Sequence, residues 1–162
     1  MKSLIHMEML NMPAPEFRLK DYRGMPHRLS DFAGQPVILY FYPKDMTPGC
    51  TLEAQEFRDH IREIEDENAV VIGISPDDAA SHKKFCEGEN LNFTLLSDPG
   101  GEVARLYDVW KEKTTFGHKQ FGNQRTTFLI DAQGKVRKVY TNVKPVGHAN
   151  EVIADLRALV EA

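Results

Sequence analysis

A short loop between an apolar run and an amphipathic run constrains this chain more than any other feature. Residues 37–42 are apolar or aromatic, residues 43–50 hold two prolines, a glycine and Cys50, and the amphipathic run opens at Thr51. This order predicts a buried strand, a tight loop and a helix, with Cys50 in or beside the first helical turn. Free N–H groups and the macrodipole at a helix N-terminus stabilise a thiolate, the reactive form of cysteine. We therefore expect a reactive cysteine here, and an inert, buried cysteine is the alternative.

Two further features of the loop favour the reactive interpretation. The Thr47 hydroxyl stands three residues before the sulfur, where it can fold back toward the thiolate or toward an oxygen of a bound substrate. Pro43 and Pro48 stiffen the loop and remove competing N–H donors. The loop is therefore expected to present Cys50 to a substrate.

The loop and several later motifs resemble those of a known family. Pro43, Thr47 and Cys50 match the Pro-x-x-x-Thr-x-x-Cys signature of the peroxiredoxins, and residues 40–51 are similar to the bacterioferritin comigratory protein (PrxQ) branch. The similarity extends from about Pro13 to the C-terminal helix and includes residues 57–59, 81–85, 95–98 and 125–131. The resemblance implies a peroxidase that reduces hydrogen peroxide and organic hydroperoxides through a sulfenic acid on Cys50, with no cofactor and no metal.

The resemblance also assigns the residues that stabilise the reacting oxygens. They are Thr47, Arg125 and the backbone N–H groups around Gly49 and Cys50. Arg125 lies 75 positions after Cys50, so spacing alone cannot place it, but it begins an expected strand. Its guanidinium would supply a charged, planar fork of donors that lysine cannot copy. Pro43 and Gly49 are expected to contribute to substrate binding.

Two more residues complete the expected site. Glu53 lies one helical turn after Cys50 and is expected to orient Arg125, although glutamate is favoured in a first helical turn in any case. Many relatives in the branch carry a second cysteine five residues after the first, where this chain has Gln55. Another subgroup carries it in the following helix, at about the distance of Cys86. The resemblance therefore implies an intramolecular Cys50–Cys86 disulfide, and a structural core cysteine is the alternative.

The expected disulfide requires a conformational change. Bridged cysteines need Cα atoms within about 7 Å of each other. Cys50 and Cys86 lie on separate predicted helices, so we do not expect them this close in the reduced fold, and one or both helices would unwind locally. A thioredoxin-like partner would then reduce the disulfide by exchange.

Length and composition bound the domain count, the compartment and the partners. A chain of 162 residues favours a single domain over residues 1–162, with residues 1–12 as a loosely ordered tail or a short pairing strand. A net charge of −4 argues against nucleic-acid binding, and no run approaches the ~20 apolar residues of a membrane-spanning helix. Two cysteines and the absence of a signal-peptide pattern favour a cytoplasmic protein. The resemblance implies a monomer.

The remaining pattern predicts the order of the elements. Strands are expected at residues 17–19 and 27–29 as a hairpin, at 37–42, 70–74 and 93–97, and at 126–130 and 136–140 as a second hairpin. Helices are expected at residues 51–67, from 75–78 to near 88, at 103–106 and at 152–160, with a helical turn at 30–34 and a loop at 107–124. Alternating strands and helices imply an α/β fold with a central mixed sheet covered on both faces. The resemblance implies that this fold is thioredoxin-like.

Three other functions remain open. A thiol–disulfide oxidoreductase would share the fold, but the chain lacks the Cys-x-x-Cys pair that is typical of one. A metal-binding module would use His82 and Cys86, four residues apart on a helix, but no second such pair is present. A redox-sensing or holdase protein would form the sulfenic acid without turnover. The lysines of the predicted loop are either solvated or give the site entrance a positive field: Lys111, Lys113 and Lys119.

Overall fold

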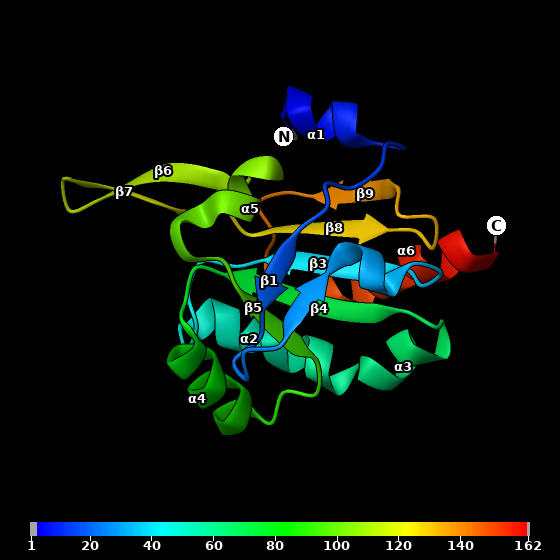
Figure 1. Cartoon of the computed structure of the whole chain (residues 1–162), viewed down its shortest axis with the longest axis horizontal. Coiled ribbons are helices and arrows are strands. Elements are labelled where there is room, and N and C mark those ends of the chain that lie inside the picture. Colours follow the sequence, from blue (N-terminus) through cyan, green and yellow to red (C-terminus); the bar gives the residue numbers. More distant parts are fainter. Residues whose placement is uncertain (1–2, 162) are drawn as a thin grey trace.

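The computed structural model describes residues 3–161, and its centre is one mixed sheet. Seven strands follow the order β2–β1–β5–β4–β3–β8–β9, and β6 and β7 form a separate ribbon (Figure 1). The strands are β1 (Arg18–Lys20), β2 (Pro26–Arg28), β3 (Val37–Phe41), β4 (Val70–Ser75), β5 (Thr94–Ser97), β6 (Trp110–Thr115), β7 (His118–Asn123), β8 (Thr126–Ile130) and β9 (Val136–Tyr140). The helices are α1 (Leu4–Met9), α2 (Pro48–Asp59), α3 (Ile61–Asp66), α4 (Ala79–Glu89), α5 (Glu102–Leu106) and α6 (His148–Glu161), with short 3-10 turns at Leu29–Phe32 and Pro99–Gly101. Among the described residues, no helix has the length and apolar character needed to cross a membrane.

Strand β3 runs through the middle of the sheet, as the apolar run at residues 37–42 predicts. It pairs in parallel with β4 and antiparallel with β8, and all of its residues are buried because both of its faces are covered. In the register with β8, Phe41 at the end of β3 faces Thr126. Arg125, which directly precedes Thr126, is therefore placed beside the loop that follows β3 and leads to Cys50.

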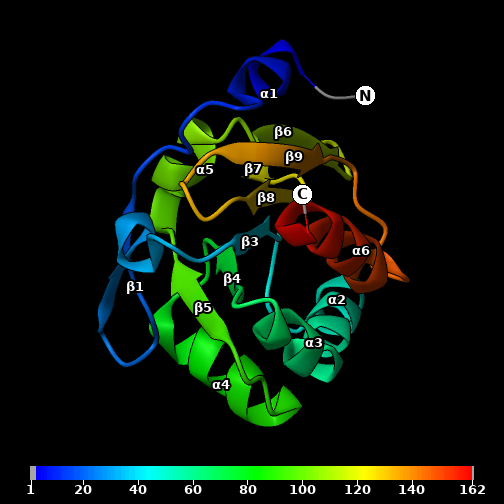
Figure 2. The same ribbon diagram turned by 90° about the vertical axis from the view of Figure 1, so that its right-hand side faces the viewer.

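Helices cover both faces of the sheet, as predicted. Ile38 and Tyr40 of β3 point into a core shared with α2, α3, α4 and α6, whereas the alternate residues of β3 point into a core closed by α1, α5 and the first 3-10 turn. Figure 2 shows α2, α3 and α6 on one side of the strands and α1 and α5 on the other. Cys50 and Cys86 both belong to the first core, so the two thiols lie on the same side of the sheet.

Residues Leu4–Met9 fold as helix α1, which corrects the expectation of a loose tail, whereas the alternative of pairing holds, within residues 3–12, only for a single β-bridge between Leu10 and Val136. The Ser3 hydroxyl caps the helix by accepting a hydrogen bond from the backbone N–H of His6 at 3.0 Å. The His6 side chain is buried, and its Nε2 lies 2.9 Å from the carbonyl oxygen of Tyr107. A helix of six residues is too short for its periodicity to stand out in a sequence. Residues 1 and 2 of the expected tail lie outside the described residues.

The segment at residues 107–124, expected to be a loop, contains the β6–β7 ribbon. The two strands are antiparallel, with Trp110 opposite Asn123. Phe116 and Gly117 form the turn with φ angles of 51° and 79°, the positive values that a tight hairpin turn requires. Figure 1 shows the ribbon projecting from the body of the protein. Most of its residues are exposed, so the sequence carries no alternating apolar face that would reveal the strands.

The helix predicted over residues 51–67 is divided into α2 and α3. Helix α2 begins three residues earlier than predicted, and the two helices are separated at His60, whose φ of −107° and ψ of 12° interrupt the helical path. Phe57 before the break and Ile64 after it pack into the same core. The apolar periodicity therefore continues across the break and does not reveal it.

The other predicted elements are present, and α4 differs only in its end. Asp78 caps α4 by accepting a hydrogen bond from the backbone N–H of Ser81 at 2.9 Å. The helix passes through Gly88, where its end was predicted, and stops at Asn90, which adopts the left-handed conformation with φ of 52°. The hairpins β1–β2 and β8–β9, strands β4 and β5, and helices α5 and α6 follow the predicted order.

Candidate active site

Cys50 lies in the first turn of α2, as predicted. Thr47 is the N-cap residue, with an extended backbone (φ −84°, ψ 155°), and Pro48 and Gly49 precede Cys50 inside the helix. Proline suits this turn because its missing N–H would have no intrahelical partner. The Cys50 side chain is 1% exposed and its thiol is free. The partial positive charge of the helix N-terminus therefore acts on a buried sulfur.

Arg125 contacts the Cys50 sulfur from the start of β8. Its Nη2 donates to Sγ of Cys50 at 3.4 Å, and its Nη1 donates to Oε1 of Glu53 at 2.7 Å. The antiparallel pairing of β8 with β3 makes this contact possible between residues 75 positions apart. Glu53 is 1% exposed and follows Cys50 by one helical turn, so α2 holds the guanidinium at two points. The structure thus brings Cys50, Glu53 and Arg125 together.

Burial and charge oppose each other in this group. Burial raises the pKa of Glu53 to about 7, against the lowering effect of the Arg125 guanidinium. Burial acts to lower the pKa of Arg125, but the Glu53 carboxylate and the Cys50 sulfur raise it by more, so its pKa lies above its usual value. Oε2 of Glu53 is buried and has no hydrogen-bond partner among the described residues. Near neutral pH, Glu53 therefore gains and loses a proton while Arg125 stays charged.

The Thr47 hydroxyl does not fold back onto the Cys50 sulfur, which corrects that expectation. It donates instead to the carbonyl oxygen of Lys44 at 2.7 Å. Its single proton is thereby engaged within the loop, and its lone pairs remain available to accept a hydrogen bond from a substrate. Pro43 is half-buried in the same loop, two residues after the end of β3.

Gly49 leaves room for the guanidinium. A Cβ atom at this position would lie 3.1 Å from Nη2 of Arg125 and 3.6 Å from Cγ of Pro145. The first distance is tighter than ordinary packing, so a side chain here would shift the guanidinium by a few tenths of an ångström. Glycine at position 49 therefore lets the first turn of α2 lie against Arg125 without this shift.

Cys86 lies on α4, in the same core as Cys50 but on a different helix. Its side chain is 8% exposed and its thiol is free, so the two cysteines are not joined in this conformation. Burial raises the pKa of Cys86 to about 12, and the negative charge of Asp45 contributes to the rise. A thiol with this pKa is almost entirely protonated at neutral pH and is a poor nucleophile. Cys86 is therefore protected from reaction while α4 is folded in this position.

Lys113 of β6 is exposed, as a solvated side chain would be, and it also lies close enough to the site to be affected by its charges. Its Nζ donates to the carbonyl oxygen of Asn123 at 3.0 Å. Burial and the charge of Arg125 lower the pKa of Lys113, while the Cys50 sulfur acts to raise it. The side-chain amide of Asn123 donates to the carbonyl oxygen of Tyr42 at 3.1 Å and so ties β7 to the end of β3. The ribbon therefore brings a second cation near Cys50, which favours the alternative of a positive field at the entrance.

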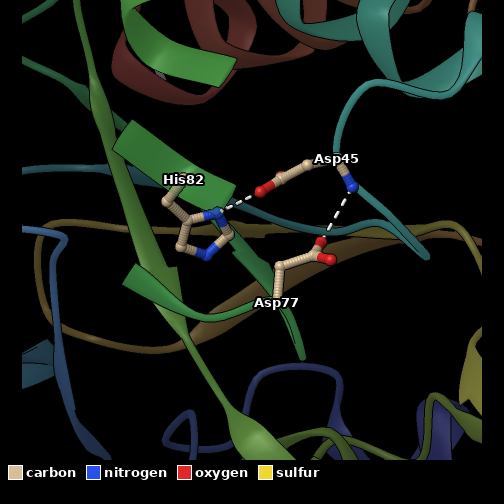
Figure 3. A group of neighbouring side chains, drawn as sticks. All are labelled: Asp45, Asp77 and His82. Atoms are coloured by element: carbon tan, nitrogen blue, oxygen red, sulfur yellow. Dashed lines mark hydrogen bonds and ion pairs between the residues drawn. The ribbon is translucent and has the colours of Figure 1, made fainter. Parts of the chain in front are cut away.

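A buried polar cluster, which sequence reasoning missed, joins the loop before Cys50 to α4. The Asp45 carboxylate accepts hydrogen bonds from Tyr42 Oη at 2.5 Å, Ser81 Oγ at 2.8 Å and His82 Nδ1 at 2.7 Å. The backbone N–H of Asp45 donates to Oδ2 of Asp77 at 2.8 Å, and Figure 3 shows the two acids and His82 converging. We call these five residues the Asp45 cluster. The sequence did not reveal this cluster, because the spacing of its polar residues does not predict that the loop and α4 make contact.

The hydrogen bonds of His82 leave it no free nitrogen for a metal ion. Its Nδ1 faces Asp45 and its Nε2 lies 3.1 Å from the carbonyl oxygen of Leu96. Both ring nitrogens are therefore engaged by oxygen atoms of the protein, and neither points into open space. Ligand atoms of Asp45, Asp77 and His82 lie within 4.8 Å of one another, and the Asp45 carboxylate already accepts hydrogen bonds from Tyr42 and Ser81. The zinc alternative built on His82 and Cys86 therefore has no support.

The geometry supports nucleophilic chemistry at sulfur. Cys50 offers the nucleophile, and the guanidinium of Arg125 and the helix N-terminus offer positive charge to an electron-rich transition state. The free lone pairs of Thr47 can orient a substrate that carries an O–H group. The site can thus bind a small polar substrate and stabilise negative charge as a bond to oxygen breaks.

The sequence is similar to known proteins along most of its length. Residues 10–139 match the AhpC/TSA family. Peroxiredoxin Bcp of Bacillus subtilis is 44% identical over 152 residues, which cover 94% of this chain and 97% of that protein. Peroxiredoxin Bcp of Escherichia coli is 44% identical over 140 residues, which cover 86% of this chain and 90% of that protein.

Solved structures show the same fold. The bacterioferritin comigratory protein of Xanthomonas campestris, described for its alkyl peroxide reduction activity, superposes with a TM-score of 0.84 at 36% identity, covering 89% of this chain and 92% of that one. Peroxidoxin BcpB of Mycobacterium tuberculosis has a TM-score of 0.83 at 38% identity, covering 93% and 97%. The thioredoxin-like architecture expected for this chain is confirmed.

Proposed function

This chain belongs to the AhpC/TSA family as a peroxiredoxin of the PrxQ branch, a thiol-dependent peroxidase, and we propose that Cys50 is the residue that its peroxide substrate oxidises. One observation carries this assignment. Cys50 is buried in a first helical turn with Nη2 of Arg125 at 3.4 Å from its sulfur. Two independent sources of positive charge thus face one sulfur and can stabilise the negative charge of the reacting atoms.

The reaction is a displacement at the terminal peroxide oxygen. The Cys50 thiolate attacks this oxygen, a sulfur–oxygen bond forms and the oxygen–oxygen bond breaks. The remaining oxygen leaves as hydroxide or alkoxide and takes up a proton to become water or an alcohol. Cys50 is oxidised to a sulfenic acid, and the peroxide is reduced by two electrons.

The surrounding residues have distinct proposed roles. Arg125 stabilises the charge that spreads from sulfur to the leaving oxygen, together with the free N–H groups around Gly49. Thr47 accepts a hydrogen bond from the peroxide, because its own proton is directed at Lys44. Pro43 shapes the loop around the bound peroxide. Glu53 is a positioning residue for Arg125, and the 2.7 Å contact between them supports this role.

Cys86 is the proposed resolving cysteine. Its thiolate attacks the Cys50 sulfenic acid and forms an intramolecular disulfide, which a thioredoxin-like dithiol then reduces by exchange. Both cysteines lie in the same core, which supports the pairing. The protonated, buried state of Cys86 requires that α4 first opens locally.

The family and the site support further proposals about the substrates and the setting of this protein. We propose hydrogen peroxide and organic hydroperoxides as substrates, supported by the alkyl peroxide reduction described for the X. campestris protein. We propose that residues 1–162 act as one domain, which is supported by a single seven-stranded sheet with strands from Arg18 to Tyr140. We further propose that the protein is a monomer in the cytoplasm. Neither a nucleic acid, a membrane, a metal nor a cofactor has a part in this mechanism.

Intact-mass analysis after one equivalent of hydrogen peroxide tests the assignment of both cysteines. Wild type is expected to lose two hydrogens, and Cys86→Ser is expected to gain one oxygen. Cys50→Ser is the matched control and should not change in mass. Oxidation of Cys50→Ser at the wild-type rate would refute the role of Cys50, and a gain of one oxygen in the wild type would refute the role of Cys86.

A further inference from the structure

Helix α4 is fastened at its N-terminal end to the loop before Cys50. Ser81 and His82, in the first turns of α4, both donate to Oδ2 of Asp45, at 2.8 and 2.7 Å. Asp45 is 3% exposed and His82 is fully buried, so solvent screens their attraction little. His82 precedes Cys86 by one helical turn. The contact therefore ties the part of α4 that carries Cys86 to the segment that carries Cys50.

A second set of hydrogen bonds holds the C-terminal end of α4 against α2. Nε2 of Gln55 donates to Oε1 of Glu89 at 2.8 Å, and Nη1 of Arg58 donates to the carbonyl oxygen of Glu89 at 2.7 Å. Both donors belong to α2, the helix that begins in the turn of Cys50. Gln55 stands where many relatives in the branch carry a second cysteine. In this chain, Gln55 instead forms a hydrogen bond with Glu89 of α4, the helix that carries Cys86.

Resolution by Cys86, the step proposed above, requires α4 to leave this position. Cys86 is 8% exposed, and burial and the charge of Asp45 raise its pKa to about 12. When α4 opens, water reaches the thiol and the distance from Asp45 grows, so the thiolate forms more readily. The thiolate then attacks the Cys50 sulfur: the sulfur–sulfur bond forms, the sulfur–oxygen bond of the sulfenic acid breaks, and hydroxide leaves and is protonated to water.

We propose that Asp45, Ser81 and His82 are positioning residues that hold α4 closed while peroxide reacts at Cys50 and that set the rate at which Cys86 resolves the sulfenic acid. The inference rests on the proposed roles of the two cysteines. Each hydrogen bond in this contact must break before α4 opens, so each one slows resolution. A slow resolution leaves the sulfenic acid exposed to a second peroxide, which oxidises it to a sulfinic acid that thiol exchange does not reverse.

Four variants separate this role from general destabilisation. Ser81→Ala removes one hydrogen bond to Asp45 and keeps the buried ion pair, so the protein is expected to fold. Ser81→Thr retains the hydroxyl and is expected to form the disulfide at the wild-type rate. Asp45→Asn removes the carboxylate that both Ser81 and His82 contact. Lys84→Ala, on the exposed side of the same helix, is the matched control.

The test follows disulfide formation after rapid mixing with one equivalent of hydrogen peroxide, by acid quenching and intact mass. Ser81→Ala is expected to form the disulfide about three- to tenfold faster than wild type, and Asp45→Asn faster still if it folds. Under excess peroxide, Ser81→Ala should accumulate less sulfinic acid in the same proportion. The rate of sulfenic acid formation, measured with each substitution on a Cys86→Ser background, should change much less than the rate of disulfide formation.

Two failures can be told apart. If wild type forms no disulfide, the resolving role of Cys86 is refuted and this inference with it. If wild type forms the disulfide but Ser81→Ala does so at the rate of wild type and Lys84→Ala, only the role of the Asp45 contact is refuted. A fall in unfolding free energy without a faster disulfide step would likewise show that the contact is purely structural.

Discussion

Nη1 of Arg125 lies 2.7 Å from Oε1 of Glu53, while Nη2 of the same guanidinium contacts the sulfur of Cys50. A single planar group therefore links a buried carboxylate to the reactive thiol. Because a guanidinium is rigid, the contact with Glu53 fixes the direction in which its other N–H groups point. The position of the positive charge at the sulfur thus depends on a residue that does not itself touch the sulfur.

Arg125→Lys should lower the rate of peroxide reduction by about 100-fold or more, as loss of a preorganised donor to a developing negative charge does in other enzymes. An ammonium group cannot donate to Glu53 and to the reacting atoms with the geometry of the fork. The measurement is kcat/KM for hydrogen peroxide with excess reductant. Arg157→Lys on α6, an exposed position, is the control and should keep full activity. A loss below threefold in Arg125→Lys would contradict the assigned role.

Glu53→Gln should change how stability depends on pH. The pKa of Glu53 is about 7 in the folded protein, against 4.5 as its ordinary value, so the folded state holds the extra proton between these pH values. The resulting stabilisation is fully present below pH 4.5 and is lost as pH rises through 7. Relative to Glu53→Gln, wild type should therefore lose on the order of 3 kcal/mol of unfolding free energy between pH 4 and 8.

Urea unfolding of both proteins at matched pH values measures this difference directly. Groups such as Asp21 and Asp155, whose pKa values are lowered by hydrogen bonds in spite of burial, titrate in both proteins and cancel in the comparison. Parallel pH profiles for the two proteins would mean that folding does not raise the pKa of Glu53.

Gly49→Ala should separate stability from activity. Alanine favours the helix over glycine by up to about 1 kcal/mol, so the variant should be at least as stable as wild type. The added Cβ would lie 3.1 Å from Nη2 of Arg125 and displace the guanidinium, which should slow sulfenic acid formation about tenfold. Gly88→Ala, in α4 with no atom within 4 Å of the added Cβ, should gain stability without this loss. Equal rates of sulfenic acid formation in the two variants would show that displacement of the guanidinium does not slow the reaction.

Thr47→Val should lower the rate of peroxide reduction by about 100-fold, and Thr47→Ser should retain most of it, because only the hydroxyl can accept from the substrate. Loss of an N-cap side chain normally costs about 1 kcal/mol, but the Thr47 side chain makes no capping hydrogen bond. Thr47→Val does lose the hydrogen bond to the carbonyl oxygen of Lys44, so its unfolding free energy should fall by about 1 kcal/mol. Steady-state peroxide consumption and urea unfolding together check both statements. Full activity in Thr47→Val would remove the hydroxyl from the mechanism.

The local part of the site is readable from the sequence, because strand, loop and helix follow one another within residues 37–59. The place of Cys50 in the first turn of α2 depends only on these neighbours. The place of Arg125 depends on the register of β8 against β3, a pairing between distant segments that no local pattern specifies. Resemblance to a family was needed to select this arginine from the others.

Other features stay hidden because their residues look ordinary in sequence. Asp45 and His82 read as a loop acid and an incidental helix histidine, and only the packing of α4 against the loop turns them into a buried ion pair. The β6–β7 ribbon has mostly exposed residues on both strands, so its pattern is that of a loop. The break at His60 lies within an unbroken apolar stripe and leaves no mark on the periodicity.

The pairing of Phe41 with Thr126 also determines when the thiol can become reactive during synthesis. A nascent chain exposes Cys50 long before the ribosome has added Arg125, and the two meet only after β8 has joined β3. On the proposed role of Arg125, unfinished or unfolded chains therefore carry an ordinary thiol at position 50. In newly made protein, Cys50 would therefore react only slowly with peroxide until β8 has paired with β3.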